Sequence, residues 1–122
     1  MPIFEQFDVV VVPFPFTDSN KTKRRPALVI STNQHFNSPI SHSVMAMITS
    51  ATDSDWPLDV RISDLELAGL KSPSIIRMKL FTLDHRLIIR TAGRLGEVDS
   101  RNALQSLGIA FNLNTEHFLN QK

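Results

Sequence analysis

Short stretches rich in apolar and β-branched residues recur along the chain and are separated by turn residues. This pattern predicts six β-strands, over residues 8–12, 26–31, 43–49, 58–62, 74–83 and 87–94. The second strand is apolar from Ala27 to Ile30, which is typical of a strand buried on both faces. The stretch 58–62 alternates instead and predicts a shorter, half-exposed strand. Turns are expected at 33–39, where a single helical turn would also fit, and at 84–86.

A long helix near the end of the chain and a short helical turn in its middle complete the pattern. The long helix is expected to begin near Asp99 or Ser100, either of which could cap it. Its apolar stripe, at i, i+3, i+4, i+7 spacing, consists of Leu104, Leu107, Gly108 and Phe111. In the short turn, Ser63 and Glu66 have capping-box spacing, and Gly69 lies where a left-handed C-cap is needed. Strands followed by a closing helix predict a mainly β fold, a small curled barrel with one helix packed across it.

The composition narrows the class of protein. With 122 residues, 42% hydrophobic and 20% charged, the chain is expected to form one domain over residues 1–122. It contains no cysteine, which excludes disulfide frameworks and cysteine-ligated zinc. No apolar run approaches the roughly 20 residues of a membrane helix, and no basic segment with an apolar stretch opens the sequence. We therefore expect a cytoplasmic protein with no membrane partner.

Charge is distributed unevenly, although the net charge is only +1. Four basic residues crowd one short segment: Lys21, Lys23, Arg24 and Arg25. Residues 71–94 hold six basic side chains and one acid, whereas 53–66 hold five acids and one arginine. One interpretation is a positive surface that favours phosphate-bearing ligands. A mixed, solvated surface is the other.

The sequence carries no motif for a metal or a nucleotide cofactor. The histidines show neither HxH nor HxxxH spacing, and no carboxylate cluster accompanies them; they are His35, His42, His85 and His117. None of the four glycines opens a phosphate-binding loop, and there is no GxSxG motif. No metal and no cofactor are therefore predicted.

The basic segment Lys23–Pro26, which leads directly into the second strand, is the main candidate for chemistry. Its proline favours an extended backbone for Arg25. A guanidinium is suited to this position because it binds two phosphate oxygens at once and stays charged. If the first two strands pair as a hairpin, the loop with Phe14 and Phe16 emerges at the same rim. These phenylalanines and Trp56 either offer faces to unstacked bases or belong to the core.

Four stretches carry a family resemblance. They are Asp8–Asp18, Lys23–Ser31, Ile48–Ser50, and Leu70–Arg77 with its continuation Leu80–Asp84. In this order they resemble the MazF/PemK toxins of the CcdB-like barrel superfamily, and the similarity extends through the last helix. The RPALVIS strand with a downstream ITS is the most specific part. The resemblance implies an SH3-like curled barrel of the CcdB/PemK type with a C-terminal α-helix.

The same resemblance implies a function. Members are metal-independent endoribonuclease toxins of type II toxin-antitoxin systems, which cleave single-stranded RNA such as mRNA and inhibit growth. The resemblance further implies a homodimer with RNA bound across its interface, and a small, acidic, partly disordered antitoxin as partner. The family's catalytic pair corresponds to Arg25 and Thr49. The RNA-binding residues that it implies are Phe14, Phe16, Lys23, Arg24, Ser50, Arg77 and Lys79.

The expected reaction is attack of the ribose 2′-OH on the adjacent phosphorus. Its products are a 2′,3′-cyclic phosphate, or the 3′-phosphate formed from it, and a 5′-OH. Arg25 would stabilise the charge of the transition state and the Thr49 hydroxyl would donate a second hydrogen bond. Because arginine has a pKa above about 12, it is a poor base. Water, the phosphate itself or a nearby histidine, His35 or His42, would move the proton.

The chain departs from the family pattern at two places. Phe7 replaces the glycine that usually precedes the aspartate of the first strand, which affects a turn rather than the chemistry. Some relatives carry a histidine in the first loop, or a catalytic acid near Arg77. This chain has Thr17, Asp18 and Met78 instead, so the sequence does not identify a general base.

Two alternatives remain open at this point. A CcdB-like toxin would inhibit DNA gyrase through protein contacts and cleave nothing. The presence of Arg25–Pro26 and Thr49 favours the nuclease over that reading. A catalytically silent relative, folded and able to bind an antitoxin, is the second alternative, and the departures from the family pattern leave room for it.

Overall fold

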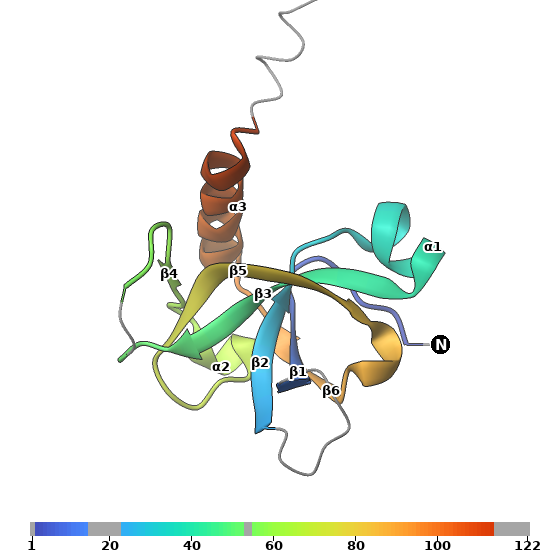
Figure 1. Cartoon of the computed structure of the whole chain (residues 1–122). Helices are drawn as coiled ribbons and strands as arrows, with labels where there is room; N and C mark the ends of the chain where they lie inside the picture. The colour runs from blue at the N-terminus through green and yellow to red at the C-terminus, as the bar shows by residue number, and fades with distance from the viewer. Residues whose placement is uncertain (1, 15–22, 53–54, 114–122) are drawn as a thin grey trace, which may run out of the picture.

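The computed structural model describes residues 2–14, 23–52 and 55–113, whose strands form one antiparallel sheet in the order β4-β5-β3-β2-β1-β6. The strands are β1 (Asp8–Phe14), β2 (Lys23–Val29), β3 (His42–Ser50), β4 (Val60–Arg61), β5 (Ser74–Asp84) and β6 (Arg90–Arg94). The sheet curls on itself, so that β1 and β2 run across the long strands β3 and β5 (Figure 1). The predicted small curled barrel is confirmed.

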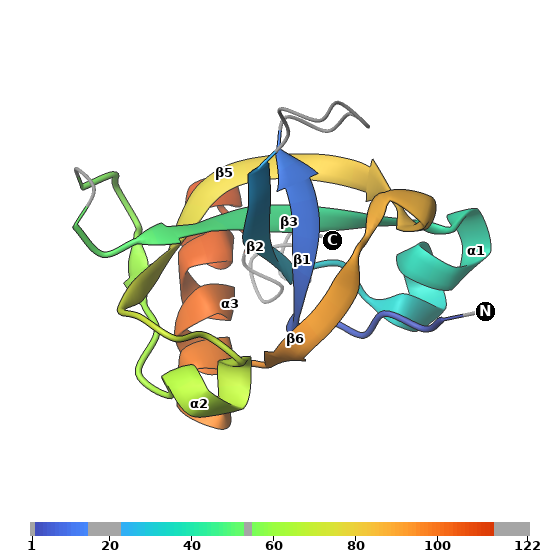
Figure 2. The same ribbon diagram turned by 90° about the horizontal axis from the view of Figure 1, so that it is seen from below.

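Short helices fill the connections and a long one closes the chain. They are a π-helical turn (Asn33–Asn37), α1 (Ser38–Ile40), α2 (Leu65–Ala68), a 3₁₀ turn (His85–Leu87) and α3 (Glu97–Phe111). The C-terminal helix α3 packs against β4 and β5, whereas α1 lies at the opposite end of the molecule (Figure 2). None of the described helices is long and apolar enough to cross a membrane.

The central strands are buried on both faces, as the apolar run of the second strand predicts. Because successive side chains of a strand point to opposite faces, neighbouring residues enter two separate clusters. The cluster on the α3 side includes Val9, Leu28, Ala46, Ile76 and Ala103. The cluster on the other face includes Val10, Ala27, Met45 and Leu83. This double burial fixes the register of β1, β2 and β3 and therefore the positions of the residues at their ends.

The strand boundaries differ from the predicted ones in informative ways. Residues 23–25, which the sequence places ahead of the second strand, are the first residues of β2 and pair with Phe14, Pro13 and Val12 of β1. The fourth strand shrinks to Val60–Arg61 because Leu58 adopts a left-handed backbone, with φ +68°, in the turn before it. The last strand begins only at Arg90, because the residues before it form the 3₁₀ turn.

The helix ends also correct the predicted caps. Helix α3 begins at Glu97 with Gly96 at its N-cap, not near Asp99 or Ser100. The buried Asp99 carboxylate instead accepts hydrogen bonds from the Ser63 amide and hydroxyl, at 2.9 and 2.8 Å. Asp99 therefore ties α3 to the segment ahead of α2.

In α2, the expected C-cap is confirmed and the expected N-cap is not. Gly69 has the left-handed conformation, with φ +74°. The N-cap is Asp64 rather than Ser63, and its side chain accepts from the Leu67 amide at 3.0 Å. On α3, the predicted apolar stripe is only partly covered: Leu107 is buried, whereas Leu104 and Phe111 are exposed and line a groove beside β2 and β3.

Phe7, which stands where the family usually has glycine, keeps the backbone conformation that glycine would favour. Its φ is +75°, in the left-handed region that costs a non-glycine residue about 1–2 kcal/mol. Its amide donates to the Val29 carbonyl at 2.7 Å and its own carbonyl accepts from the Leu95 amide at 3.0 Å. The buried phenyl ring joins the core cluster on the α3 side, which offsets the strain.

Candidate functional site

A cavity of about 240 Å³ opens where the ends of β1, β2, β3 and the middle of β5 meet the segment ahead of β4. The side chains that line it are Phe14, Arg25, Met47, Ile48, Thr49, Trp56, Arg77 and Lys79. Three of these residues carry positive charge, and none of the described residues in the lining is acidic. The lining thus joins cations to two aromatic rings.

Arg25 is positioned by the hairpin of β1 and β2. It lies opposite Val12, directly before Pro26, and its guanidinium lies 5.7 Å from the centre of the Phe14 ring. The Arg25 Nε is buried and has no hydrogen-bond partner among the described residues. A buried donor without an acceptor is costly, and more so on a charged group. An anion in the cavity would remove that cost.

Thr49 reaches the same cavity from the neighbouring strand. The pairing of β2 with β3 ends at Ala27 and Met47, and Arg25 and Thr49 each lie two residues beyond that last pair on their own strands. On its other side, Thr49 pairs with Ile75 of β5. The two residues that the family resemblance singles out therefore lie on adjacent strands and line one cavity.

A bulge in β5 brings two more basic residues to the cavity. Ala46 pairs with Leu80, but the next residue, Met47, pairs with Arg77, so β5 holds two extra residues at this step. Bulges of this kind bend a strand and change the direction of its side chains. The Lys79 Nζ lies 5.5 Å from the centre of the Phe14 ring. Phe14 thus contacts cations from two strands.

Arg77 is held by an acid from outside the cavity lining. Its Nη2 and Nε donate to the two Asp59 carboxylate oxygens at 2.9 and 3.2 Å. Burial alone would raise the pKa of Asp59, but the hydrogen bonds from Arg77 and from the Trp56 amide together hold that pKa below its ordinary value. Asp59 is therefore ionised and compensates the charge of Arg77, while the Arg77 guanidinium lies 5.1 Å from the Trp56 ring centre.

The structure does not bring every expected residue into the cavity. Lys23 and Arg24 are exposed on β2, and Ser50 is exposed at the end of β3, where its hydroxyl hydrogen-bonds that of Thr52. None of the three lines the cavity. Phe16 lies outside the described residues.

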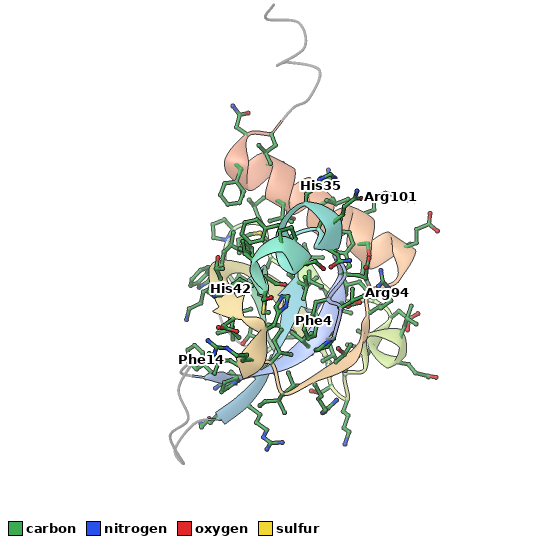
Figure 3. All side chains as sticks on the ribbon, turned by 90° about the vertical axis from the view of Figure 1, so that its right-hand side faces the viewer. Phe4, Phe14, His35, His42, Arg94 and Arg101 are labelled. Carbon is green, nitrogen blue, oxygen red and sulfur yellow. The ribbon has the colours of Figure 1, made fainter. Side chains whose placement is uncertain are left out.

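The histidines suggested as proton carriers lie elsewhere. His42 opens β3 and Thr49 is the residue before its end, a separation of about 23 Å along an extended strand. His35 belongs to the π-helical turn, and Figure 3 shows it well apart from Phe14. Neither histidine is placed to move a proton at this cavity. No group of three or more histidine or carboxylate side chains able to hold a metal gathers in the described part of the chain.

Sequence reasoning missed Asp59 and left the role of Trp56 open. Asp59 is one of the five acids between 53 and 66, and the charge pattern gives none of them a role of its own. The sequence does carry a signal for the turn that holds these two residues: in the run Trp56–Asp59, a proline occupies the second position, which favours a tight turn. That signal predicts the turn, but not its ion pair with Arg77, which follows from the pairing of β4 with β5.

The fold and the cavity together define a small curled half-barrel with a cationic, aromatic-lined pocket at the ends of its central strands. Residues 5–111 match the family described as PemK-like, MazF-like toxin of type II toxin-antitoxin system. The chain belongs to this toxin family.

Solved structures of low sequence identity share the fold. The MazE-MazF complex (Form-III) from Deinococcus radiodurans has a TM-score of 0.74 at 19% identity, over 93% of this chain and 100% of that one. The Mycobacterium tuberculosis toxin MazF-mt6 has a TM-score of 0.67 at 20% identity, over 88% and 98%. An endoribonuclease in complex with its cognate antitoxin, from a mycobacterial species, has a TM-score of 0.67 at 14% identity, over 93% and 98%. A search of curated protein sequences finds no match.

Proposed function

We propose that the chain is a metal-independent endoribonuclease toxin that cleaves single-stranded RNA, with Arg25 and Thr49 as its catalytic pair. One observation carries the proposal: both residues line one cationic cavity, and the Arg25 Nε is buried there without a partner among the described residues. A phosphate would supply the missing acceptor. Family membership supports the same conclusion.

In the proposed reaction, the ribose 2′-oxygen attacks the adjacent phosphorus and the bond from phosphorus to the 5′-oxygen breaks. The products are a 2′,3′-cyclic phosphate and a 5′-OH. Negative charge develops on the non-bridging phosphate oxygens, where the Arg25 guanidinium and the Thr49 hydroxyl donate hydrogen bonds. Donors already fixed in place stabilise such a transition state most, because they need no reorganisation as the charge develops.

The described residues of the cavity lining include neither histidine nor carboxylate. We therefore assign proton transfer to water or to a phosphate oxygen: the 2′-OH proton leaves by this route and the departing 5′-oxygen receives a proton in the same way. Arg25 is too weak an acid and base for this step near neutral pH.

The remaining residues bind or position the RNA. Lys79 and Phe14 contact each other at the cavity and would hold a phosphate and a base. Lys23 lies two residues before Arg25, on the same face of β2, and would extend the positive surface together with Arg24. Ser50 would hydrogen-bond the RNA at the end of β3. The charge of Arg77 is compensated by Asp59, so we assign it mainly to positioning.

We also propose a homodimer and a cognate antitoxin as partners. Support comes from the similar solved structures, which include MazE-MazF complexes and an endoribonuclease with its antitoxin. Light scattering of the purified protein tests the dimer. Co-expression with a small acidic open reading frame from the same operon tests the antitoxin, since the complex should purify as one species.

The function is tested by incubating the protein with a long single-stranded RNA in excess EDTA and analysing the ends of the fragments. The proposal expects cleavage in EDTA, fragments with 2′,3′-cyclic phosphate or 3′-phosphate ends, and 5′-OH ends. A 2′-deoxy nucleotide at a mapped cleavage site should block the cut there, because it removes the nucleophile. Intact RNA after incubation with folded protein would contradict the proposal, as would cleavage that EDTA abolishes.

A further inference from the structure

A second cavity, of about 350 Å³, lies beside the first at the β4 edge of the sheet. It is lined by Asp55, Trp56, Leu58, Asp59, Arg61 and Ile75. Trp56 lines both this cavity and the first one, which holds Arg25 and Thr49. Any ligand that extends from one cavity to the other therefore passes this indole.

Trp56 is exposed, yet it is held in place from several directions. The residue is 42% exposed, while the Arg77 guanidinium lies 5.1 Å from the ring centre. Its amide donates to the Asp59 carboxylate at 2.9 Å, and the Asp59 amide donates back to the Trp56 carbonyl at 3.3 Å. Because Asp59 also binds Arg77, one carboxylate fixes both the turn and the cation under the ring.

The backbone of the turn Trp56–Asp59 has little conformational freedom. Pro57 has a restricted φ, and Leu58 after it has φ +68°, the arrangement of a type II turn that usually carries glycine. A large aromatic ring on a constrained turn loses little conformational entropy when a ligand stacks on it. The geometry is therefore that of a prepared platform rather than of an incidental surface residue.

We propose that Trp56 is the stacking platform for one nucleobase of the RNA, seated in the second cavity next to the scissile phosphate. The inference rests on the proposed function and adds a base-binding subsite to it. Every base has a π-face, so the indole supplies affinity without choosing among bases. The exposed Asp55 carboxylate and Arg61 guanidinium supply an acceptor and donors for the edge of that base.

The protein contains one tryptophan, so its indole emission reports on Trp56 alone. The probe is a labelled single-stranded oligoribonucleotide that spans a mapped cleavage site and carries a 2′-deoxy nucleotide there, which keeps it intact. Binding of this probe to the wild-type protein should quench the emission. Trp56→Leu should weaken binding, followed by anisotropy of the label, by about 5- to 150-fold, the range for loss of one base–aromatic stack. Trp56→Phe should retain most of the affinity.

Two controls separate stacking from a structural effect. Phe36→Leu removes another exposed ring, in the π-helical turn whose His35 Figure 3 shows well apart from Phe14, and should leave binding unchanged. Abasic substitutions along the probe should identify one base whose removal weakens binding to the wild-type protein but not to Trp56→Leu. Equal binding of the probe by wild-type protein and Trp56→Leu, in a protein that cleaves RNA, would overturn the subsite and leave the proposed function intact. A wild-type protein that neither binds nor cleaves RNA would overturn both.

Discussion

Arg77 and Asp59 form a two-point ion pair between β5 and the turn ahead of β4, with nitrogen–oxygen distances of 2.9 and 3.2 Å. Only 9% of the Arg77 side chain and 12% of the Asp59 side chain are exposed. The pair thus lies largely out of water, on the border of the two cavities. It links the stability of this rim of the barrel to the placement of Trp56.

Removing the acid should destabilise the fold. Asp59→Asn leaves the Arg77 charge nearly buried without its counter-charge, and we expect the free energy of unfolding to fall by about 2–3 kcal/mol, somewhat less than for a fully buried pair. Chemical denaturation measures the change. The matched control is Asp84→Asn, whose partner Arg86 is 89% exposed; water already screens that pair, so its loss should matter far less. Equal destabilisation by both variants would contradict this account.

The stability of the protein should fall as the pH is lowered, in two stages. Burial and the nearby His42 lower the pKa of His85 below its ordinary value. Below about pH 6.5 the unfolded chain therefore binds a proton at this residue more readily than the folded one, so stability decreases until the folded residue titrates as well. Differential scanning calorimetry between pH 8 and 5 should show a falling Tm, and His85→Gln should reduce the slope.

In the second stage, at lower pH, stability is lost because carboxylates become protonated. Asp59 has a lowered pKa, and the hydrogen bonds from the Arg86 side chain and amide lower the pKa of Asp84 to about 2. The stabilising contribution of Asp59 is complete above the ordinary carboxylate range and is lost as the pH falls through its folded-state pKa. Water screens the pair of Asp84 with the exposed Arg86, so that pair contributes little to the profile. The steepest loss of Tm from this source should lie below about pH 4. Asp59→Asn should flatten that part of the profile, and an unchanged profile would contradict the assignment.

Substitutions at Phe7 can separate the cost of its left-handed backbone from the stabilisation by its buried ring. Phe7→Ala should destabilise the protein by about 3–5 kcal/mol through loss of the buried ring. Phe7→Gly loses the same ring but relieves the left-handed strain, so it should be more stable than Phe7→Ala by about 1 kcal/mol. This order reverses the usual ranking of the two residues. Urea denaturation of both variants checks it.

Lys79 should contribute to RNA affinity mainly through charge. Lys79→Gln should weaken binding of an uncleavable oligonucleotide and reduce the slope of log K against log salt concentration by about 0.7, the value for one phosphate contact on a single strand. Arg101→Gln makes the same change of net charge on α3, which Figure 3 shows away from Phe14. That control should leave the slope unaltered.

The strand pattern predicts much of the fold, whereas the assignment of Arg25 and Thr49 to one site comes from the family resemblance. Two apolar strands buried on both faces can pair in few registers, and the residues at their ends are then brought to one rim. The Arg77–Asp59 pair is different: the two residues lie 18 positions apart, and the two extra residues of the β5 bulge set the side-chain directions there. No local pattern encodes such a bulge.

Long-range hydrogen bonds also explain the mistaken helix cap. Asp99 has the right chemistry for an N-cap, but its carboxylate is recruited by Ser63, which lies 36 positions away. Local propensity predicts that an acid will lie near the beginning of the helix, and the tertiary fold decides which amide groups it binds.

The catalytic assignment of Arg25 is the central claim, and the single-turnover rate of RNA cleavage by Arg25→Gln tests it most directly. The account predicts a folded protein that melts at or above the wild-type temperature, because the buried donor without a partner among the described residues is gone. It should cleave about 10²–10³-fold more slowly, because one fixed donor to the transition-state phosphate is lost. Cleavage by Arg25→Gln at the wild-type rate would contradict it.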